Sequence, residues 1–211
     1  MRFWRTDNSS IMQILMGSSF EPIGVPQEKF RGHLIRISTQ RMKLRSGKEL
    51  VFEMAERPPG VRILVTDGTR ILLTKEWRSE SNDWDYRLPG GKVFDSVDEY
   101  LQGTSTGNID DFARDTAKKE LKEETSLDLS LDSFGQIHRS ICGATIVWDL
   151  YYFLVKLPKE QVRELDAITT LEGEQTHPQW FSFDDVRKLC IDGHVREDRT
   201  VGVLFRYLES M

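Results

Sequence analysis

The sequence is poor in cysteine, with only Cys142 and Cys190 in 211 residues, and their separation does not match a metal-binding motif. So few thiols exclude a disulfide-stabilised scaffold and favour a reducing, cytoplasmic location. There is no run of about eighteen apolar residues, so no membrane-spanning helix is expected. The apolar stretch 11–16 is shorter than the apolar region of a signal peptide.

Runs of basic residues are also missing, although 30% of the residues are charged and the formal net charge is −5. Without a basic run or stripe, no nucleic-acid partner is expected. No internal repeat or low-complexity tract occurs. A hydrophobic content of 38% over this length predicts one globular domain with a normal core, or one domain plus a small appendage.

What the sequence does contain is a series of strand-like segments. Residues 33–44 alternate in polarity, 45–48 form a turn signal and 49–56 resume the alternation, which predicts a β-hairpin. Residues 61–75 predict two apolar strands around the Asp67-Gly68 turn. Further strands are expected at 134–141, 144–150, 151–157 and 179–182, and terminal helices at 184–190 and 197–208. This mixture predicts an α/β fold with a mixed sheet.

Residues 112–126 predict a helix with one side suited to packing on a sheet. Ala113, Ala117 and Leu121 recur every four residues and form a small, apolar stripe.

Three carboxylates, Glu120, Glu123 and Glu124, recur on a neighbouring side of this helix at i, i+3 and i+4. Like charges at this spacing destabilise a helix, whereas a hard cation such as Mg²⁺ requires a cluster of oxygens. The Pro89-Gly90-Gly91 turn lies upstream, where a backbone carbonyl can approach the same cation. The pattern therefore indicates a metal site.

A solvated helix face is the alternative interpretation. Lys118, Lys119 and Lys122 lie among the carboxylates and can screen their charges. The helix alone does not decide between the two interpretations, and the residues on either side of it are needed.

Residues 119–127, KELKEETSL, resemble the second half of the Nudix box, G-x5-E-x7-R-E-U-x-E-E-x-G-U, in which U is aliphatic. All three glutamates of the motif's core match, and Gly91 stands for its first glycine. Lys119 replaces the motif's arginine, which keeps the charge but loses the two-pronged donor. Ser126 replaces glycine, so a left-handed residue at the helix end would be strained.

The first half of the motif departs further. Asp111 stands where the first glutamate is expected, and it follows Gly91 by twenty positions instead of six. The loop is therefore about fourteen residues longer than in the motif, an insertion that costs little loop-closure entropy. Within the inserted residues 93–110 we expect one or two helical turns at 96–102, with Ser96 as N-cap, and then a mobile loop at 103–108.

The resemblance implies a Nudix-type α/β/α sandwich with a mixed sheet over residues 57–211, preceded by an extension at 1–56 that contains the β-hairpin. This hairpin is similar to the N-terminal strands of the ADP-ribose pyrophosphatase branch. In that branch the strands exchange across a homodimer and help to form the substrate pocket, so a homodimer is expected here.

The resemblance also implies the chemistry, which is Mg²⁺-dependent hydrolysis, with Mn²⁺ as an alternative metal. The expected substrate is a nucleoside diphosphate derivative, foremost ADP-ribose, which would give AMP and ribose 5-phosphate. Nucleotide sugars, dinucleoside polyphosphates and caps, or a Nudix-fold module that binds ligand without turnover, remain alternatives.

Site residues carry over by position. The Gly90 carbonyl, Glu120, Glu123 and Glu124 are expected to hold the metal, with Glu123 also a catalytic candidate. Arg57 and Arg78 are expected to bind the diphosphate, or else to pair with surface carboxylates.

The expected general base is Glu174, with Glu172 and His177 as alternatives. Trp77 and Trp84 are candidates for stacking on a base, although core or interface packing is the more common role of tryptophan.

Overall fold

The computed structural model describes residues 20–143, 145–158 and 176–211. Its chain divides into two compact units. The first contains the chain up to Gly60 together with the segments Lys92–Phe112 and Ile141–Asp149. The second contains Val61–Gly91, Ala113–Ser140 and Leu150–Met211.

The first unit is built on a four-stranded sheet in the order β1-β2-β3-β8. Strands β1 (Phe20–Arg31), β2 (Arg36–Leu44) and β3 (Glu49–Glu56) are antiparallel, and β8 (Ile146–Val147) runs parallel to the end of β3. The predicted hairpin is therefore confirmed as β2–β3. Strand β1 was not predicted from the sequence, and it pairs with β2 along most of its length.

The inserted residues form helix α2 (Val97–Thr106) in the first unit. The predicted cap is confirmed, since Ser96 Oγ accepts a hydrogen bond from the Glu99 amide at 3.2 Å. The expected loop at 103–108 is wrong, because the helix continues to Thr106. Gly103 serves packing there instead of a turn, since a Cβ on it would lie 2.6 Å from the Phe94 ring. At its start the helix is fastened to the β1–β2 turn by a hydrogen bond from the Val97 amide to the His33 carbonyl.

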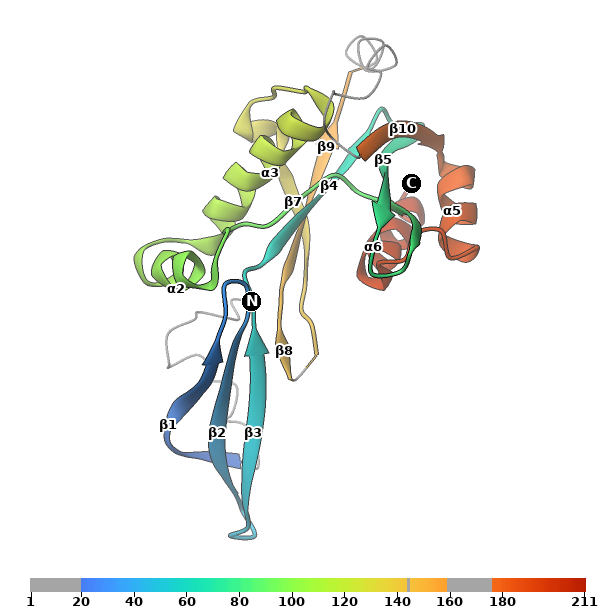
Figure 1. The fold of residues 1–211 in the computed structure, drawn as a ribbon. Helices are drawn as coiled ribbons and strands as arrows, with labels where there is room; N and C mark the ends of the chain where they lie inside the picture. Colours follow the sequence, from blue (N-terminus) through green and yellow to red (C-terminus); the bar gives the residue numbers. More distant parts are fainter. Residues whose placement is uncertain (1–19, 144, 159–175) are drawn as a thin grey trace. The chain divides into compact units, whose positions relative to one another are not determined.

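The second unit is a sandwich around a six-stranded mixed sheet in the order β10-β5-β4-β9-β7, with β6 also paired to β5. Its strands are β4 (Gly60–Thr66), β5 (Arg70–Arg78), β6 (Asp83–Arg87), β7 (Gly135–Ser140), β9 (Leu150–Lys156) and β10 (Thr176–Ser182). Figure 1 shows helix α3 (Ile109–Thr125) on one side of these strands and helices α5 (Phe183–Ile191) and α6 (Asp198–Leu208) on the other. The predicted α/β/α sandwich is confirmed.

The core of this sandwich is formed by segments that were predicted to be apolar strands or an apolar helix face. Every residue of β4 is buried, and β9 is buried except for half-buried Leu154 and exposed Lys156. The stripe predicted on α3 is also confirmed, since Ala113, Ala117 and Leu121 are fully buried. A helix whose buried face consists of small residues can approach a sheet closely, which fixes the neighbouring face with its glutamates relative to the strands. Among the described helices none is long and apolar enough to cross a membrane.

Candidate functional site

The Pro89-Gly90-Gly91 turn is fastened to β4 by two backbone hydrogen bonds. The Val61 amide donates to the Gly91 carbonyl at 2.9 Å, and the Ile63 amide donates to the Pro89 carbonyl at 2.8 Å. Gly90 lies between them with φ +149, and a Cβ there would be 2.1 Å from the Val61 carbonyl oxygen. Only glycine fits this position, because both the backbone conformation and the close approach exclude a side chain.

Two glutamates of α3 face this turn. The Gly90 amide donates to both carboxylate oxygens of Glu124, each at 3.3 Å. A Cβ on Gly91 would lie 2.4 Å from Oε1 of Glu120, so this carboxylate rests against the glycine backbone. The two carboxylates are one helical turn apart. The structure thus brings together the turn and two of the carboxylates that the sequence singled out.

Glu123 points elsewhere. Its side chain is 52% exposed and forms an i, i+4 ion pair with Lys119, at 3.7 Å between Nζ and Oε2. Within residues 20–143, 145–158 and 176–211, no three histidine, cysteine, aspartate or glutamate side chains lie close enough together to hold a metal ion.

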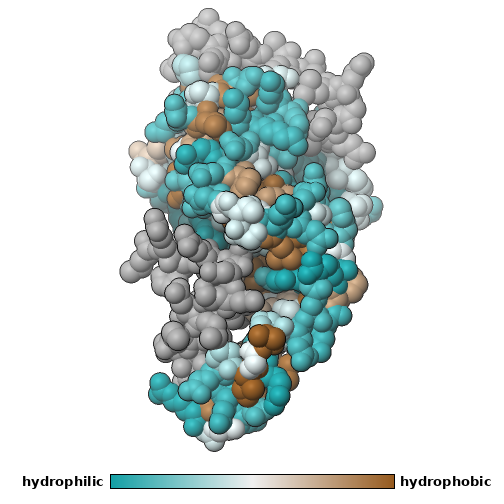
Figure 2. All heavy atoms as spheres, turned by 90° about the vertical axis from the view of Figure 1, so that its left-hand side faces the viewer, coloured by the Kyte–Doolittle hydropathy of each residue, from teal (hydrophilic) through white to brown (hydrophobic). Residues whose placement is uncertain are grey.

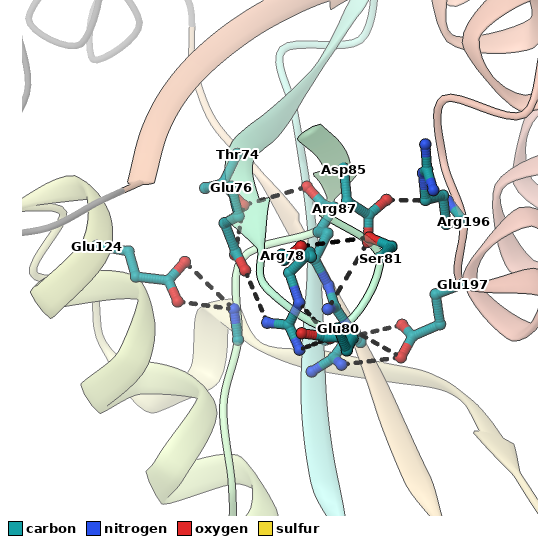
Figure 3. Close-up of polar contacts among 12 residues, drawn as sticks. Thr74, Glu76, Arg78, Glu80, Ser81, Asp85, Arg87, Glu124, Arg196 and Glu197 are labelled. Atoms are coloured by element: carbon teal, nitrogen blue, oxygen red, sulfur yellow. Dashed lines mark hydrogen bonds and ion pairs between the residues drawn. The ribbon is translucent and has the colours of Figure 1, made fainter. Parts of the chain in front are cut away.

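A further carboxylate, that of Glu76 on β5, reaches the same region. Figure 3 shows Glu124 extending from α3 and Glu76 extending from β5 towards it. Glu76 accepts hydrogen bonds from Thr74 Oγ1 at 3.3 Å and from Arg78 Nη1 at 3.4 Å. Sequence reasoning did not name Glu76 as a site residue. The signal was a carboxylate two residues after buried Thr74, and therefore on the same face of the strand.

The closeness of Glu76, Glu120 and Glu124 affects the pKa of Glu124. Burial raises the pKa of Glu124 to about 8, the negative charges of Glu76 and Glu120 add to this effect, and the Gly90 hydrogen bond opposes it. A carboxyl group in this environment favours a proton or a cation over an isolated negative charge. Oxygen atoms of carboxylates are also what a hard divalent ion prefers. The residues therefore fit such an ion in chemical kind and in charge.

The two predicted substrate arginines belong to different units. Arg78, at the end of β5, forms ion pairs with Glu76 at 3.4 Å and with Glu80 at 2.6 Å. Arg57, in the first unit, places its guanidinium 4.4 Å from the centre of the Trp148 ring.

The candidate general bases fall partly beyond the described residues. Glu172 and Glu174 lie outside them. His177 is described, and its ring lies 6.2 Å from that of Trp84. Residue Thr176, at the start of β10, pairs with Glu76 in the β10–β5 ladder.

Trp77 and Trp84 form a cross-strand pair between β5 and β6, with ring centroids 5.5 Å apart in an edge-to-face arrangement. They are 42% and 38% exposed, so neither is a core residue. Lys75 completes the cluster, with its ammonium 4.9 Å from the Trp84 ring.

Strand β4, to which the turn is hydrogen-bonded, also carries one partner of an ion pair that the sequence did not indicate. Arg62 on β4 donates from Nε and Nη2 to the two carboxylate oxygens of Glu197, at 2.8 and 2.9 Å. Arg87 donates to the same carboxylate at 3.2 Å.

Comparison with known proteins identifies the family to which the chain belongs. The sequence profile of the NUDIX domain matches residues 56–201. A search of curated protein sequences found no match. Among solved structures, one described as the crystal structure of ADP compounds hydrolase superposes with a TM-score of 0.58 and 16% sequence identity, over 92% of this chain and 96% of that one. At this identity the likeness concerns the fold, whereas the profile spans most of the chain and contains the turn and the carboxylate helix. The chain therefore belongs to the Nudix family.

Proposed function

We propose that this protein hydrolyses the diphosphate bond of a nucleoside diphosphate linked to another group, with Mg²⁺ or Mn²⁺ as cofactor. The observation that carries the proposal is the pair of carboxylates, Glu120 and Glu124, facing the Gly90-Gly91 backbone within a Nudix domain. Glu120, Glu124 and the Gly90 carbonyl are proposed to hold the metal, with Glu123 as a further ligand or catalytic group. When bound, the cation supplies positive charge that neutralises the diphosphate oxygens and acidifies water.

Arg78 is proposed to bind the diphosphate. Its guanidinium lies next to Glu76 at the acidic region, and a fork of N–H donors matches two phosphate oxygens. Its present partners are carboxylates, so a phosphate would replace contacts of the same chemical kind. Arg57 is proposed as the second phosphate ligand on the basis of the family resemblance alone.

Glu174 is proposed as the general base that accepts a proton from the attacking water, with Glu172 and His177 as alternatives. The support is its place in the chain, two residues before Thr176, which pairs with Glu76. ADP-ribose is the leading substrate, giving AMP and ribose 5-phosphate. The support for an adenosine diphosphate moiety is the resemblance of the N-terminal hairpin and the fold shared with the ADP compounds hydrolase.

The proposal is tested by turnover of ADP-ribose, a nucleotide sugar and a dinucleoside polyphosphate, each with Mg²⁺, with Mn²⁺ and without metal. We expect Glu120→Gln and Glu124→Gln each to lower kcat by about a hundredfold or more, because each removes a negative metal ligand. The matched control is Asp115→Asn, an exposed carboxylate of the same helix, which should leave kcat unchanged. If ADP-ribose binds but no substrate is turned over with either metal, the protein is a ligand-binding module instead.

We further propose that the protein is a homodimer formed through the first unit. The support is the exposure of large apolar side chains on its strands, among them Val25 at 78% and Val51 at 64%. Figure 2 shows brown apolar side chains among the teal ones in its lower part, where the β1–β3 strands lie. Extended apolar exposure of this kind marks interaction surfaces. Light scattering should give twice the chain mass, and Val51→Lys should shift it towards the monomer; a monomeric wild type would contradict the proposal.

A further inference from the structure

Arg62 and Glu197 form a buried ion pair in the second unit, with side chains 9% and 12% exposed. Glu197 stands at the N-terminus of α6 and is held from three sides. In addition to the fork of Arg62, its carboxylate accepts hydrogen bonds from Arg87 Nη2 at 3.2 Å and Thr200 Oγ1 at 2.5 Å. Figure 3 shows Glu197 extending from the α6 side towards the group of polar side chains that includes Arg87. Its position is therefore fixed by several bonds, and so is that of the guanidinium it binds.

The third nitrogen of this guanidinium, Nη1, forms a hydrogen bond next to the Pro89-Gly90-Gly91 turn. Arg62 Nη1 donates to the Val61 carbonyl at 2.8 Å. This same carbonyl oxygen is the atom against which Gly90 packs, since a Cβ on Gly90 would lie only 2.1 Å from it. A continuous series of contacts therefore runs from Glu197 through Arg62 and the Val61 carbonyl to Gly90, whose amide in turn donates to Glu124.

The two backbone hydrogen bonds between β4 and the turn are accepted by the neighbours of Gly90 and not by Gly90 itself. Val61 and Ile63 donate to the carbonyls of Gly91 and Pro89, one on each side of Gly90. In an antiparallel pairing, the peptide groups between two such bonds face away from the partner strand. The Gly90 amide accordingly faces Glu124. The β4 atom nearest to a Cβ at Gly90 is the Val61 carbonyl oxygen, which accepts the hydrogen bond of Arg62 Nη1.

Stability alone is a weak explanation for this pair. A buried ion pair loses the hydration of both charges, and replacing it by apolar residues is often neutral or stabilising. Interactions one step removed from metal ligands, by contrast, orient those ligands, and their loss lowers metal affinity or activity by about ten- to a hundredfold.

We propose that Arg62, clamped by Glu197, is a positioning residue that fixes the Gly90 peptide for the cation and for the diphosphate bound to it. The inference rests on the proposed function and extends it to a pair of residues 135 positions apart in the sequence.

The test uses the full chain and the variant Arg62→Lys. Lysine keeps the positive charge, but one ammonium group cannot donate both to the Glu197 carboxylate as a fork and to the Val61 carbonyl. The matched control is Arg87→Lys, which makes the same change at the same carboxylate but has no bond to Val61. Mn²⁺ binding without substrate is measured by electron paramagnetic resonance, the Gly90 amide is followed by ¹⁵N NMR, and kcat and KM are measured with ADP-ribose.

We expect Arg62→Lys to weaken Mn²⁺ binding about tenfold, to shift the Gly90 amide resonance and to lower kcat more than it raises KM. Arg87→Lys should leave Mn²⁺ binding within about twofold of the wild type. Equal losses in the two variants, or wild-type Mn²⁺ binding by Arg62→Lys, would overturn the inference while leaving the proposed function intact. A wild type that binds no Mn²⁺ would instead refute the proposed function and the inference together. If Arg62→Lys does not fold, Glu197→Gln gives the same comparison, with a loss of about threefold expected because a neutral acceptor holds the guanidinium less firmly.

Discussion

The amide of Gly90 donates to both carboxylate oxygens of Glu124, each at 3.3 Å, so the backbone of the turn and the helix glutamate form one unit. The contact joins residues 34 positions apart and depends on the absence of a side chain at Gly90. It also gives the Glu124 carboxylate a hydrogen-bond donor. This donor stabilises the negative charge of Glu124, which Glu76 and Glu120 both repel.

Gly90→Ala should destabilise the fold strongly. The added Cβ would meet the Val61 carbonyl oxygen at 2.1 Å and would stand at φ +149, so we expect a loss of about 3 kcal/mol or more in the free energy of unfolding. Urea denaturation measures it. Gly202→Ala is the control, since nothing lies within 4 Å of a Cβ there and the position is helical, so a gain of up to about 1 kcal/mol is expected. Equal effects of the two changes would contradict the close approach at Gly90.

Ser126→Gly should stabilise the protein. Ser126 ends the carboxylate helix with φ 60, which confirms the strained cap predicted from the sequence. Glycine adopts this conformation without strain, so we expect a gain of about 1 kcal/mol, measured by thermal unfolding. Ser130→Gly is the comparison, because Ser130 has φ −67 and glycine relieves no strain there. We expect a loss of stability, since glycine increases the freedom of the unfolded chain and removes the 3.2 Å hydrogen bond between the hydroxyls of Ser130 and Ser133. A loss of stability in Ser126→Gly would show that the serine side chain is needed.

Cation binding should release a proton from Glu124. Burial and the charges of Glu76 and Glu120 raise the pKa of this carboxyl to about 8, so at pH 7 the metal-free group is mostly protonated. A cation replaces that proton, and we expect close to one proton released per Mg²⁺ at pH 7, falling to none well above pH 8. Calorimetry in buffers of different ionisation enthalpy measures the release. Glu124→Gln should abolish the release and Asp115→Asn should not; proton release that persists in Glu124→Gln would assign it to another group.

Low pH should destabilise the folded protein because the Glu197 carboxylate becomes protonated. Burial opposes its charge, but Arg62 and the hydrogen bonds of Arg62 and Thr200 outweigh burial and lower the pKa to about 2 from its ordinary value of 4.5. A lowered carboxyl pKa stabilises the fold above the unfolded value, and this contribution, about 3 kcal/mol, is lost as pH falls from about 5 to 2. Urea unfolding across this range should show a smaller slope in Glu197→Gln. The exposed Asp184→Asn should retain the wild-type slope; an unchanged slope in Glu197→Gln would exclude this role.

Arg78→Lys should raise KM for ADP-ribose by about tenfold with a smaller change in kcat, because lysine keeps the charge but loses the two parallel donors. Steady-state kinetics at saturating Mg²⁺ measure it. Arg187→Lys is the control, since Arg187 is comparably exposed and also pairs with a carboxylate, that of Asp184. A KM unchanged by Arg78→Lys would remove Arg78 from the substrate site.

Sequence pattern predicted the local parts of this molecule well. The buried stripe of α3, the β2–β3 hairpin and the strained Ser126 all follow from short-range periodicity and backbone preference, and each is found. The helix extension to Thr106 was missed because Gly103 reads as a turn residue, whereas its use is to make room for the Phe94 ring. Tertiary packing overrode local preference at this position.

The missed parts of the site are long-range. Arg62 and Glu197 are 135 positions apart, and no periodicity links a strand residue to a helix N-terminus. The predicted strand ended at residue 75, one residue before Glu76, whereas β5 continues to Arg78. That the Glu76 carboxylate lies near Glu124 depends on how β5 and α3 pack. Conversely, the three glutamates suggested a single cluster, and their spacing could not reveal that Glu123 pairs with Lys119.

The tryptophan pair of the β5–β6 hairpin has a practical consequence. Two indoles in edge-to-face contact at 5.5 Å couple their electronic transitions, which gives a paired band in far-ultraviolet circular dichroism that separated rings lack. The strand that carries Trp77 also carries Glu76 and Arg78, one residue to each side. The protein therefore contains an intrinsic optical reporter next to Glu76. Loss of the β5–β6 hairpin geometry would be detected as loss of this circular dichroism band, without any added label.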